Sequence, residues 1–583
     1  MLHTLTRSLR ENKGPALVTV LLSALEVVFE IVIPLFMSNL IDFGIEGGSM
    51  AAVWKFGAFL LLLAAFQLAT GVLAARIAAR ASVGFSANLR EDMFDNVQAF
   101  AFSNIDKFST ASIVTRLTTD TTNVQNAFQM LMRMAIRAPV MLVFSMIVSF
   151  RISHDISMTF LIILPILALA LFFIIRSVFP VFSRVFRTYD ELNNVVQENV
   201  RGIRVVKSFN QERHEIGKFG AISERIYKDF SKGERLITLN APLMQFCIYT
   251  CMIVISWLGA KAIIASGNDP ALGLTTGNLT ALITYTMQIL SSLMMLSMVF
   301  AMLTISLSSA RRIAEVLEER SDIPQPEQPV MTVRDGAVDF DHVSFVYASK
   351  ADKKVLDDID LHIRSGETIG IIGGTGASKS SLVQLIPRLY DVTGGKLTLG
   401  GVDVRDYDLD TLRGAVAMVL QKNELFSGTI KENLRWGNEN ATDEELQHAC
   451  VLACADEFIS AMPDGYDTHI EQGGTNVSGG QKQRLCIARA LLKKPKVLIL
   501  DDSTSAVDTR TDAQIQQALS TYIPDTTKII IAQRISSVQN ADRIVVLDDG
   551  HIDAVGCHDE LLRTCEIYRE VYESQQKGGE DDA

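Results

Sequence analysis

One turn of the chain reads Gly373-Gly374-Thr375-Gly376-Ala377-Ser378-Lys379-Ser380-Ser381, between an apolar run at 368–372 and a helical pattern at 382–389. Backbone N–H groups in such a turn, with a helix N-terminus behind them, bind phosphate. The spacing follows the Walker A pattern, in which the lysine reaches the outer phosphates and the next hydroxyl holds Mg²⁺. The turn therefore predicts a nucleotide site, with Lys379 and Ser380 in those roles.

Ser378 stands where this pattern has its second glycine. A Cβ is unfavourable there if the backbone needs a positive φ. An ordinary glycine-rich turn between a strand and a helix is the alternative interpretation, so the nucleotide site depends on further motifs.

Four further motifs fit a nucleotide site. Tyr347 ends a strand-like run and could stack on a base, although a lone tyrosine more often belongs to a core. Gln421 follows an apolar run and could reach Mg²⁺, with an ordinary turn as the alternative. The motif Ser478-Gly479-Gly480-Gln481 opens a helix and offers a second anion site. Asp501 ends a buried-strand run, where a carboxylate can hold the Mg²⁺ shell.

Length and charge limit the class of protein. A chain of 583 residues is too long for one ordinary domain. Its net charge of -12 argues against nucleic acid as the main partner, because a phosphate backbone requires a basic surface. The 7 cysteines lack the spacing of a zinc site, so we expect free thiols in a reducing compartment.

Apolar residues concentrate in the first half, where six stretches reach the ~20 residues that cross a bilayer. We place these spans at 16–41, 52–78, 128–150, 156–180, 240–266 and 277–305. Strand and helix patterns alternate in the second half, as in an α/β domain. The predicted fold is an α-helical six-span transmembrane domain at 1–318, a linker at 319–332, and an α/β P-loop nucleotide-binding domain at 333–583.

Basic residues gather in the two long loops between the spans, whereas the short loops carry only Arg151. By the positive-inside rule, the termini, the long loops and the nucleotide-binding domain face the cytoplasm. We expect the long loops to extend the membrane helices and to turn over near 104–116 and 205–212. The first span lacks a small-residue cleavage site and is predicted to be a retained anchor.

Two features lie inside the predicted spans. Glu26 and Glu30 are one turn apart, and carboxylates at bilayer depth usually face a bundle interior or a water-filled cavity. Met294 and Met298 follow one face of the sixth span, and methionine suits surfaces that accept varied apolar ligands. One interpretation is that these residues line a transport cavity. A structural pair of carboxylates and ordinary helix packing are the alternatives.

The order of the motifs resembles that of the ATP-binding cassette (ABC) transporters, and six spans before one cassette resemble an exporter half-transporter. The resemblance covers essentially the whole chain, and its most specific part is the motif that begins at Ser478. It implies ATP and Mg²⁺ as cofactors. It also implies a second half-transporter chain as partner, because two cassettes bind two ATP molecules head to tail.

The resemblance assigns roles to individual residues. The tips of the long loops would be the coupling helices that press on the cassettes. Mg²⁺ would be held by Ser380, Gln421 and Asp501. The remaining assignments are base stacking for Tyr347, the Q-loop glutamine for Gln421, and the D-loop for Ser505, Ala506 and Asp508.

Two positions depart from hydrolytically competent members of this family. Asp502 stands where those members have a glutamate that polarises the attacking water, and Gln533 replaces the switch histidine that contacts the γ-phosphate. Together with Ser378, these residues predict a site that binds ATP and hydrolyses it slowly. The combination resembles the degenerate-site subunit of bacterial heterodimeric multidrug exporters, in which Ser478 to Gln481 would complete the competent site of the partner.

The predicted function is ATP-driven export of a small amphipathic substrate, such as a drug, a lipid or a peptide-like molecule, across the bacterial plasma membrane. A homodimer with two slow sites is one alternative. A nucleotide-gated channel or regulatory subunit is the other, because a site that binds ATP without rapid turnover suits a conformational switch.

Overall fold

The structure is a computed structural model that describes residues 1–270, 273–347, 354–502 and 507–580. The chain forms two compact units. One consists of 1–98 with 110–319, and the other consists of Ala99–Ser109 with Arg320–Ala583. The second unit therefore includes a short segment from the first half of the sequence, which belongs to the first long loop.

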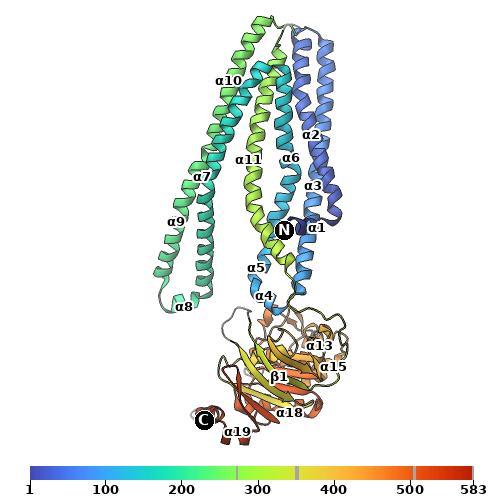
Figure 1. The fold of residues 1–583 in the computed structure, drawn as a ribbon, viewed down its shortest axis with the longest axis vertical. Coiled ribbons are helices and arrows are strands. Elements are labelled where there is room, and N and C mark those ends of the chain that lie inside the picture. The colour runs from blue at the N-terminus through green and yellow to red at the C-terminus, as the bar shows by residue number, and fades with distance from the viewer. Residues whose placement is uncertain (271–272, 348–353, 503–506, 581–583) are drawn as a thin grey trace. The chain divides into compact units, whose positions relative to one another are not determined.

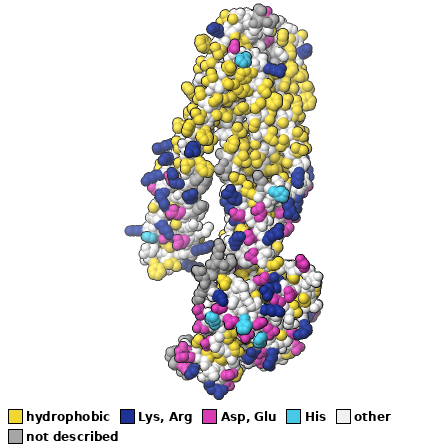
Figure 2. Space-filling view, viewed as in Figure 1, with side chains coloured by type: hydrophobic (Ala, Val, Ile, Leu, Met, Phe, Trp, Pro, Cys, Tyr) yellow, Lys and Arg dark blue, Asp and Glu magenta, His cyan; other side chains and the backbone are white. Residues whose placement is uncertain are grey.

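Long helices make up the first unit (Figure 1). Apolar side chains cover much of the helical face seen in Figure 2, as expected for a surface that contacts lipid. Six stretches among the described residues are long and apolar enough to cross a membrane, which confirms the predicted six-span class: Arg10–Glu46, Met50–Gln98, Thr110–Ile152, His154–Arg201, Glu212–Ser266 and Thr276–Phe300. The helices are α1 Leu2–Arg7, α2 Lys13–Asn39, α3 Met50–Gln98, α5 Thr110–Thr115, α6 Thr121–Ile152, α7 His154–Arg201, α8 Ile203–Ser208, α9 Glu212–Thr238, α10 Asn240–Ser266 and α11 Thr276–Glu318.

Local signals set the helix ends on one side of this unit. The helix α10 ends at Ser266, and the next residue, Gly267, has a φ of 66°, a left-handed conformation that glycine adopts without strain from a Cβ. The helix α11 begins after Thr275, whose hydroxyl accepts a hydrogen bond from the N–H of Asn278 at 3.1 Å. Asp42 accepts hydrogen bonds from the Thr275 hydroxyl at 2.6 Å and from the Gly277 N–H at 2.8 Å. This carboxylate joins the π-helical turn that follows α2 to the start of α11.

Two main sheets form the second unit, which confirms the predicted α/β class. The larger sheet has the order β12-β11-β3-β10-β9-β6, with β12 antiparallel to its neighbour and the other pairs parallel. The smaller sheet has the antiparallel order β2-β1-β4-β5. The strands are β1 Val338–Phe345, β2 Leu356–Ile363, β3 Thr368–Gly373, β4 Gly394–Leu399, β5 Val402–Asp403, β6 Val416–Val419, β7 Gly428–Thr429, β8 His469–Ile470, β9 Val497–Asp501, β10 Thr527–Ile531, β11 Arg543–Asp548 and β12 His551–Gly556.

Helices accompany these sheets, and one of them comes from the first long loop. They are α4 Phe102–Phe108, α12 Lys379–Leu385, α13 Leu409–Ala415, α14 Ile430–Arg435, α15 Asp443–Leu452, α16 Asp456–Ser460, α17 Gly479–Leu492, α18 Thr509–Tyr522, α19 His558–Thr564 and α20 Glu566–Glu580. Every residue of β9 and β10 is buried, as expected for parallel strands with both faces covered. In the register of these strands, Ile531 pairs with Asp501 on one side and with Ile371 on the other. The carboxyl ends of β3, β10 and β9 therefore lie together at one edge of the sheet.

Candidate functional site

The predicted nucleotide motifs meet at this edge of the larger sheet. The strand β3 leads into the turn 373–381, and β9 ends at Asp501. Gln533 follows β10, and Gln421 follows β6. Ligands of open parallel sheets bind outside the carboxyl ends of the strands, so the topology alone brings these segments to one place.

A cavity of about 710 Å³ lies at the same edge. The whole turn 373–381 lines it, together with Gln421, Asp501, Asp502 and Gln533. The lining also includes Lys354, Asp549 and Val571. These three residues were not predicted from the sequence, because they come from distant segments without a nucleotide motif.

Lys379 folds back over the turn 373–381, which is the predicted phosphate-binding turn. Its Nζ donates hydrogen bonds to the carbonyl oxygens of Gly373 and Gly374, both at 2.8 Å. Burial lowers the pKa of the Lys379 ammonium, and the carboxylates of Asp501 and Asp502 oppose that shift. These bonds hold the ammonium against the turn, where its charge can neutralise that of a bound phosphate.

Ser380 and Asp501 form the pair predicted to hold Mg²⁺. The Ser380 Oγ donates a hydrogen bond to Asp501 Oδ1 at 3.0 Å. Burial raises the pKa of the Asp501 carboxyl, while the bond from Ser380 and the charge of Lys379 oppose the shift. A hydroxyl and a carboxylate are the hard oxygen donors that Mg²⁺ takes beside substrate phosphates, so these residues fit that ion.

Asp502 is held by both predicted glutamines. Its Oδ2 accepts a hydrogen bond from Gln533 Nε2 at 2.8 Å and a longer one from Gln421 Nε2 at 3.4 Å. The backbone of Asp502 has a φ of 48°, in the left-handed region that aspartate enters more readily than most residues. The structure therefore places Asp502, Gln533 and Gln421 in one hydrogen-bonded group beside the phosphate-binding turn.

Tyr347 lies at the other end of the turn and is linked to α4. Its hydroxyl is 2.7 Å from the Ser381 Oγ, and its ring meets Tyr390 edge-on with centroids 5.1 Å apart. Tyr390 in turn donates a hydrogen bond to Asp106 of α4 at 2.9 Å and packs on Phe102 with centroids 6.0 Å apart. A contact between the first loop tip and the nucleotide-binding domain was expected from the sequence, whereas the part that Tyr390 takes in it was not.

The motif Ser478 to Gln481 does not belong to the cavity lining among the described residues. Ser478 caps α17: its Oγ accepts from the Gln481 N–H at 3.3 Å, and its own N–H donates to Gln481 Oε1 at 2.9 Å. Ser478 and Gly479 are exposed to solvent. Asp508 caps α18 through the Thr511 N–H at 2.9 Å, while Ser505 and Ala506 lie outside the described residues.

In the helical unit, Glu26 and Glu30 both form ion pairs with Arg137, which was not among the residues predicted from the sequence. Arg137 of α6 donates to Glu26 Oε1 at 2.7 Å and to Glu30 Oε2 at 2.6 Å. The backbone carbonyl of Glu30 accepts a further bond from Gln288 Nε2 at 3.2 Å. Both carboxylates thus tie α2 to a neighbouring helix, as the structural alternative expects. Met294 and Met298 of α11 have exposed fractions of 46% and 63%.

Comparison with known proteins gives one consistent result. Residues 16–294 match the ABC transporter transmembrane region, and residues 356–505 match the family model described as ABC transporter. The chain is 36% identical over 558 residues to the uncharacterized ABC transporter ATP-binding protein YfiB of Bacillus subtilis, covering 96% of each chain. The chain belongs to the ABC transporters. It is also 33% identical over 580 residues to the uncharacterized ABC transporter ATP-binding protein Rv1273c of Mycobacterium tuberculosis, covering 99% of this chain and 98% of the relative.

The fold of this ABC transporter is that of an exporter half-transporter. The structure of a bacterial Atm1-family ABC exporter with ATP bound superimposes with a TM-score of 0.82 at 24% identity, over 97% of this chain and 99% of that one. This ABC transporter is therefore a multi-pass membrane protein in which six spans are joined to an ATP-binding cassette, the machinery of ATP-driven transport.

Ser378 gives a testable property of this ABC transporter's phosphate-binding turn. Its φ of 66° and ψ of 20° are left-handed, where a Cβ costs about 1 kcal/mol. We expect Ser378→Gly to stabilise the nucleotide-free protein by roughly 1 kcal/mol and to raise its thermal unfolding midpoint in detergent. Ser378→Ala keeps the Cβ and serves as the control, which should unfold like the parent. Equal midpoints for the glycine and alanine variants would contradict backbone strain at this position.

Proposed function

We propose that this chain is one half of a heterodimeric exporter, and that its own site binds ATP but hydrolyses it slowly. The observation that carries the proposal is the pair of Asp502 and Gln533, joined at 2.8 Å beside the phosphate-binding turn. Asp502 is one methylene shorter than the glutamate of competent relatives, and a misplacement of ~1 Å can cost ~100-fold in rate. The amide of Gln533 can bind a phosphate but carries neither the charge nor the proton of an imidazole.

The residues expected to bind ATP are present in this chain. We therefore propose that the departures impair the hydrolysis of ATP and not its binding. Lys379 stands at the mouth of the turn, and Ser380 and Asp501 offer adjacent oxygens for Mg²⁺. Gln421 would complete the Mg²⁺ shell, and Tyr347 would stack on the adenine base. We therefore assign this site to the retention of ATP in the closed cassettes.

A second chain would complete the transporter, because exporter half-transporters act as dimers. Ser478 and Gly479 are exposed, so their N–H groups are available to a phosphate of the partner's nucleotide. The tip formed by α8 exposes apolar side chains, with Val205 60% and Phe209 71% exposed. We propose that this tip docks on the cassette of the partner, as the second coupling helix. Asp508 would belong to the D-loop between the two sites.

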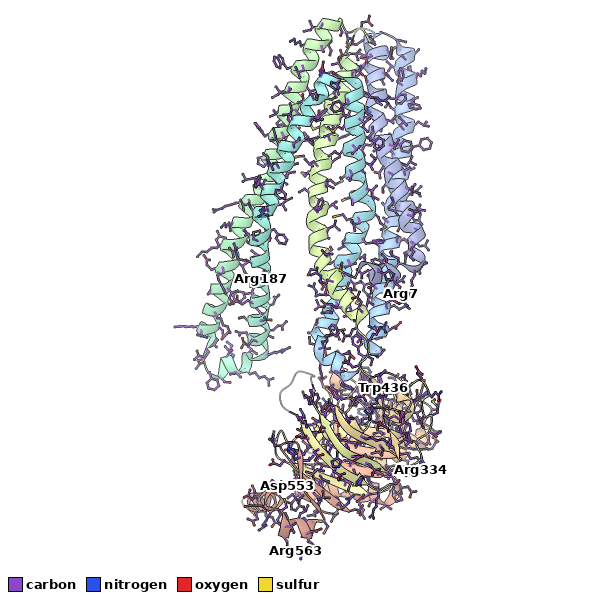
Figure 3. The ribbon with its side chains drawn as sticks, in the orientation of Figure 1. Arg7, Arg187, Arg334, Trp436, Asp553 and Arg563 are labelled. Atoms are coloured by element: carbon purple, nitrogen blue, oxygen red, sulfur yellow. The ribbon has the colours of Figure 1, made fainter. Side chains whose placement is uncertain are left out.

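The substrate would be a small amphipathic molecule, bound between helices of the two chains in the cytoplasmic membrane of a bacterium. Met294 and Met298 expose flexible apolar side chains along α11. The group of Glu26, Glu30 and Arg137 offers polar contacts at bilayer depth. Lys and Arg side chains gather on the extension formed by α7 and α9 (Figure 2), to which Arg187, labelled in Figure 3, belongs. This positive charge supports a cytoplasmic location for the long loops and for both termini.

Restoring the competent side chains tests the slow site directly. We expect the purified chain alone to hydrolyse ATP slowly, and Asp502→Glu combined with Gln533→His to raise turnover at least about tenfold. Adding Lys379→Ala to that double variant should return turnover to background, which shows that the gain arises at this site. Rapid turnover by the parent chain alone, abolished by Asp502→Asn, would overturn the proposal and favour a homodimer.

A further inference from the structure

Gln575 of α20 binds the segment that carries Gln533. Its Nε2 donates a hydrogen bond to the carbonyl oxygen of Gln533 at 2.7 Å. Its Oε1 accepts a hydrogen bond from the N–H of Ile535 at 2.9 Å. One side-chain amide thus satisfies a backbone acceptor and a backbone donor two residues apart, much as a neighbouring strand would. We call residues 532–537 the switch segment.

The helix α20, which carries Gln575, is packed against the apolar core of the second unit. Tyr568 is fully buried, and its hydroxyl is 2.8 Å from Nδ1 of His558. Val571 and Tyr572 pack against the same apolar core. Val571 also lines the ATP cavity, and Gln575 lies one helical turn further along the same face. The helix therefore connects the core, the wall of the cavity and the switch segment.

Gln533 is fixed from both ends by these bonds. Its backbone carbonyl is held by Gln575, and its side-chain amide donates to Asp502 at 2.8 Å. At the far end of the switch segment, the Ser537 hydroxyl donates to Asp512 at 2.6 Å. Among the side-chain hydrogen bonds of the described residues, those of Gln575 bind the backbone on both sides of Arg534.

We propose that Gln575 is a positioning residue, which holds the switch segment so that the amide of Gln533 meets the γ-phosphate and the site prefers ATP over ADP. The inference rests on the proposed function, in which Gln533 contacts that phosphate. A loosened switch segment would lose the contact with the γ-phosphate and keep the contacts that ATP and ADP share. The ratio of the two affinities therefore reports on Gln575 more directly than either affinity alone.

The test measures the Kd of Mg·ATP and of Mg·ADP for the full chain in lipid nanodiscs. We expect Gln575→Ala to reduce the preference for ATP roughly tenfold, the loss expected for one hydrogen bond to a charged phosphate. Gln533→Ala should reduce it to the same extent. Gln576→Ala is the matched control: this neighbour on α20 donates instead to the Tyr572 hydroxyl at 2.8 Å, so its loss should leave the preference unchanged.

The outcomes separate this inference from the function on which it rests. If Gln533→Ala removes the preference and Gln575→Ala preserves it, the positioning role is wrong and the ATP-retaining site stands. If Gln533→Ala preserves the preference, the assignment of Gln533 fails and the role of Gln575 fails with it. Hydrogen exchange supplies a second reading that does not need nucleotide. In Gln575→Ala, exchange of the Ile535 amide should rise at least about tenfold while the amides of β10 keep their rates, and an unchanged Ile535 amide overturns the inference.

Discussion

In the proposed heterodimer, Ser478→Arg is expected to reduce ATP hydrolysis at least about 100-fold, although Ser478 is not among the described residues that line this chain's own cavity. The exposed start of α17 would face the γ-phosphate of the partner's nucleotide, where N–H groups and the helix dipole stabilise the developing charge. The arginine side chain would occupy the space of the γ-phosphate, and the substitution would also remove the serine hydroxyl. Steady-state ATPase activity of the purified complex, prepared by co-expression with a candidate partner half-transporter, gives the measurement.

Two controls separate this effect from general damage. Thr442 caps α15 with the same reciprocal pattern, its hydroxyl accepting from Glu445, so Thr442→Arg tests the loss of a helix cap away from the site. Its ATPase activity should stay near that of the parent complex. Lys379→Ala disables this chain's own phosphate turn and should leave most of the hydrolysis intact. An equal loss from Lys379→Ala and Ser478→Arg would show two equivalent sites and would contradict the division of labour.

The arrangement of the candidate nucleotide site was largely predictable from sequence, because each of its parts carries a local pattern. The turn 373–381 has its own spacing, and Asp501 ends a run of buried apolar residues. The parallel strands then bring these parts together, because their carboxyl ends must meet at one edge of the sheet. This is how Asp502 and Gln533, which are 31 residues apart, come to share a hydrogen bond. The left-handed backbone at Ser378 also follows from the glycine expected there.

Contacts between distant segments were not predictable, because they depend on how elements pack. Arg137 lies within the predicted span 128–150, yet nothing in its sequence indicates that it faces α2 and bonds two carboxylates there. The bond between Tyr390 and Asp106 joins residues 284 positions apart, and it depends on the placement of α4 in the second unit. Gln575 lies on a polar helix and belongs to no motif. A single sequence carries no signal for such pairs.

Arg137→Leu is expected to destabilise the helical unit by ~3 kcal/mol, the lower end of the usual cost of removing one partner from a buried ion pair. The lower end applies because the side chains of Arg137 and Glu30 are 27% and 24% exposed. Arg137 binds both Glu26 and Glu30, and the Glu26 side chain is only 11% exposed. Loss of the guanidinium would leave two carboxylates one turn apart at bilayer depth, where an unpaired charge is costly. The unfolding midpoint of the detergent-solubilised chain, followed by the loss of helical signal, measures the effect.

Arg133→Leu removes an arginine one turn earlier on α6 and is the matched control, which should cost less than Arg137→Leu. The triple change of Glu26, Glu30 and Arg137 to leucine should recover most of the stability, because replacing a whole buried ion group by apolar residues is often neutral. A triple variant as unstable as Arg137→Leu would contradict the ion-pair explanation.

The triple variant also tests whether the group of Glu26, Glu30 and Arg137 takes part in transport. If it is stable but substrates no longer stimulate its ATPase activity in the complex, the carboxylates take part in transport; if stimulation survives, they serve only to join α2 to α6.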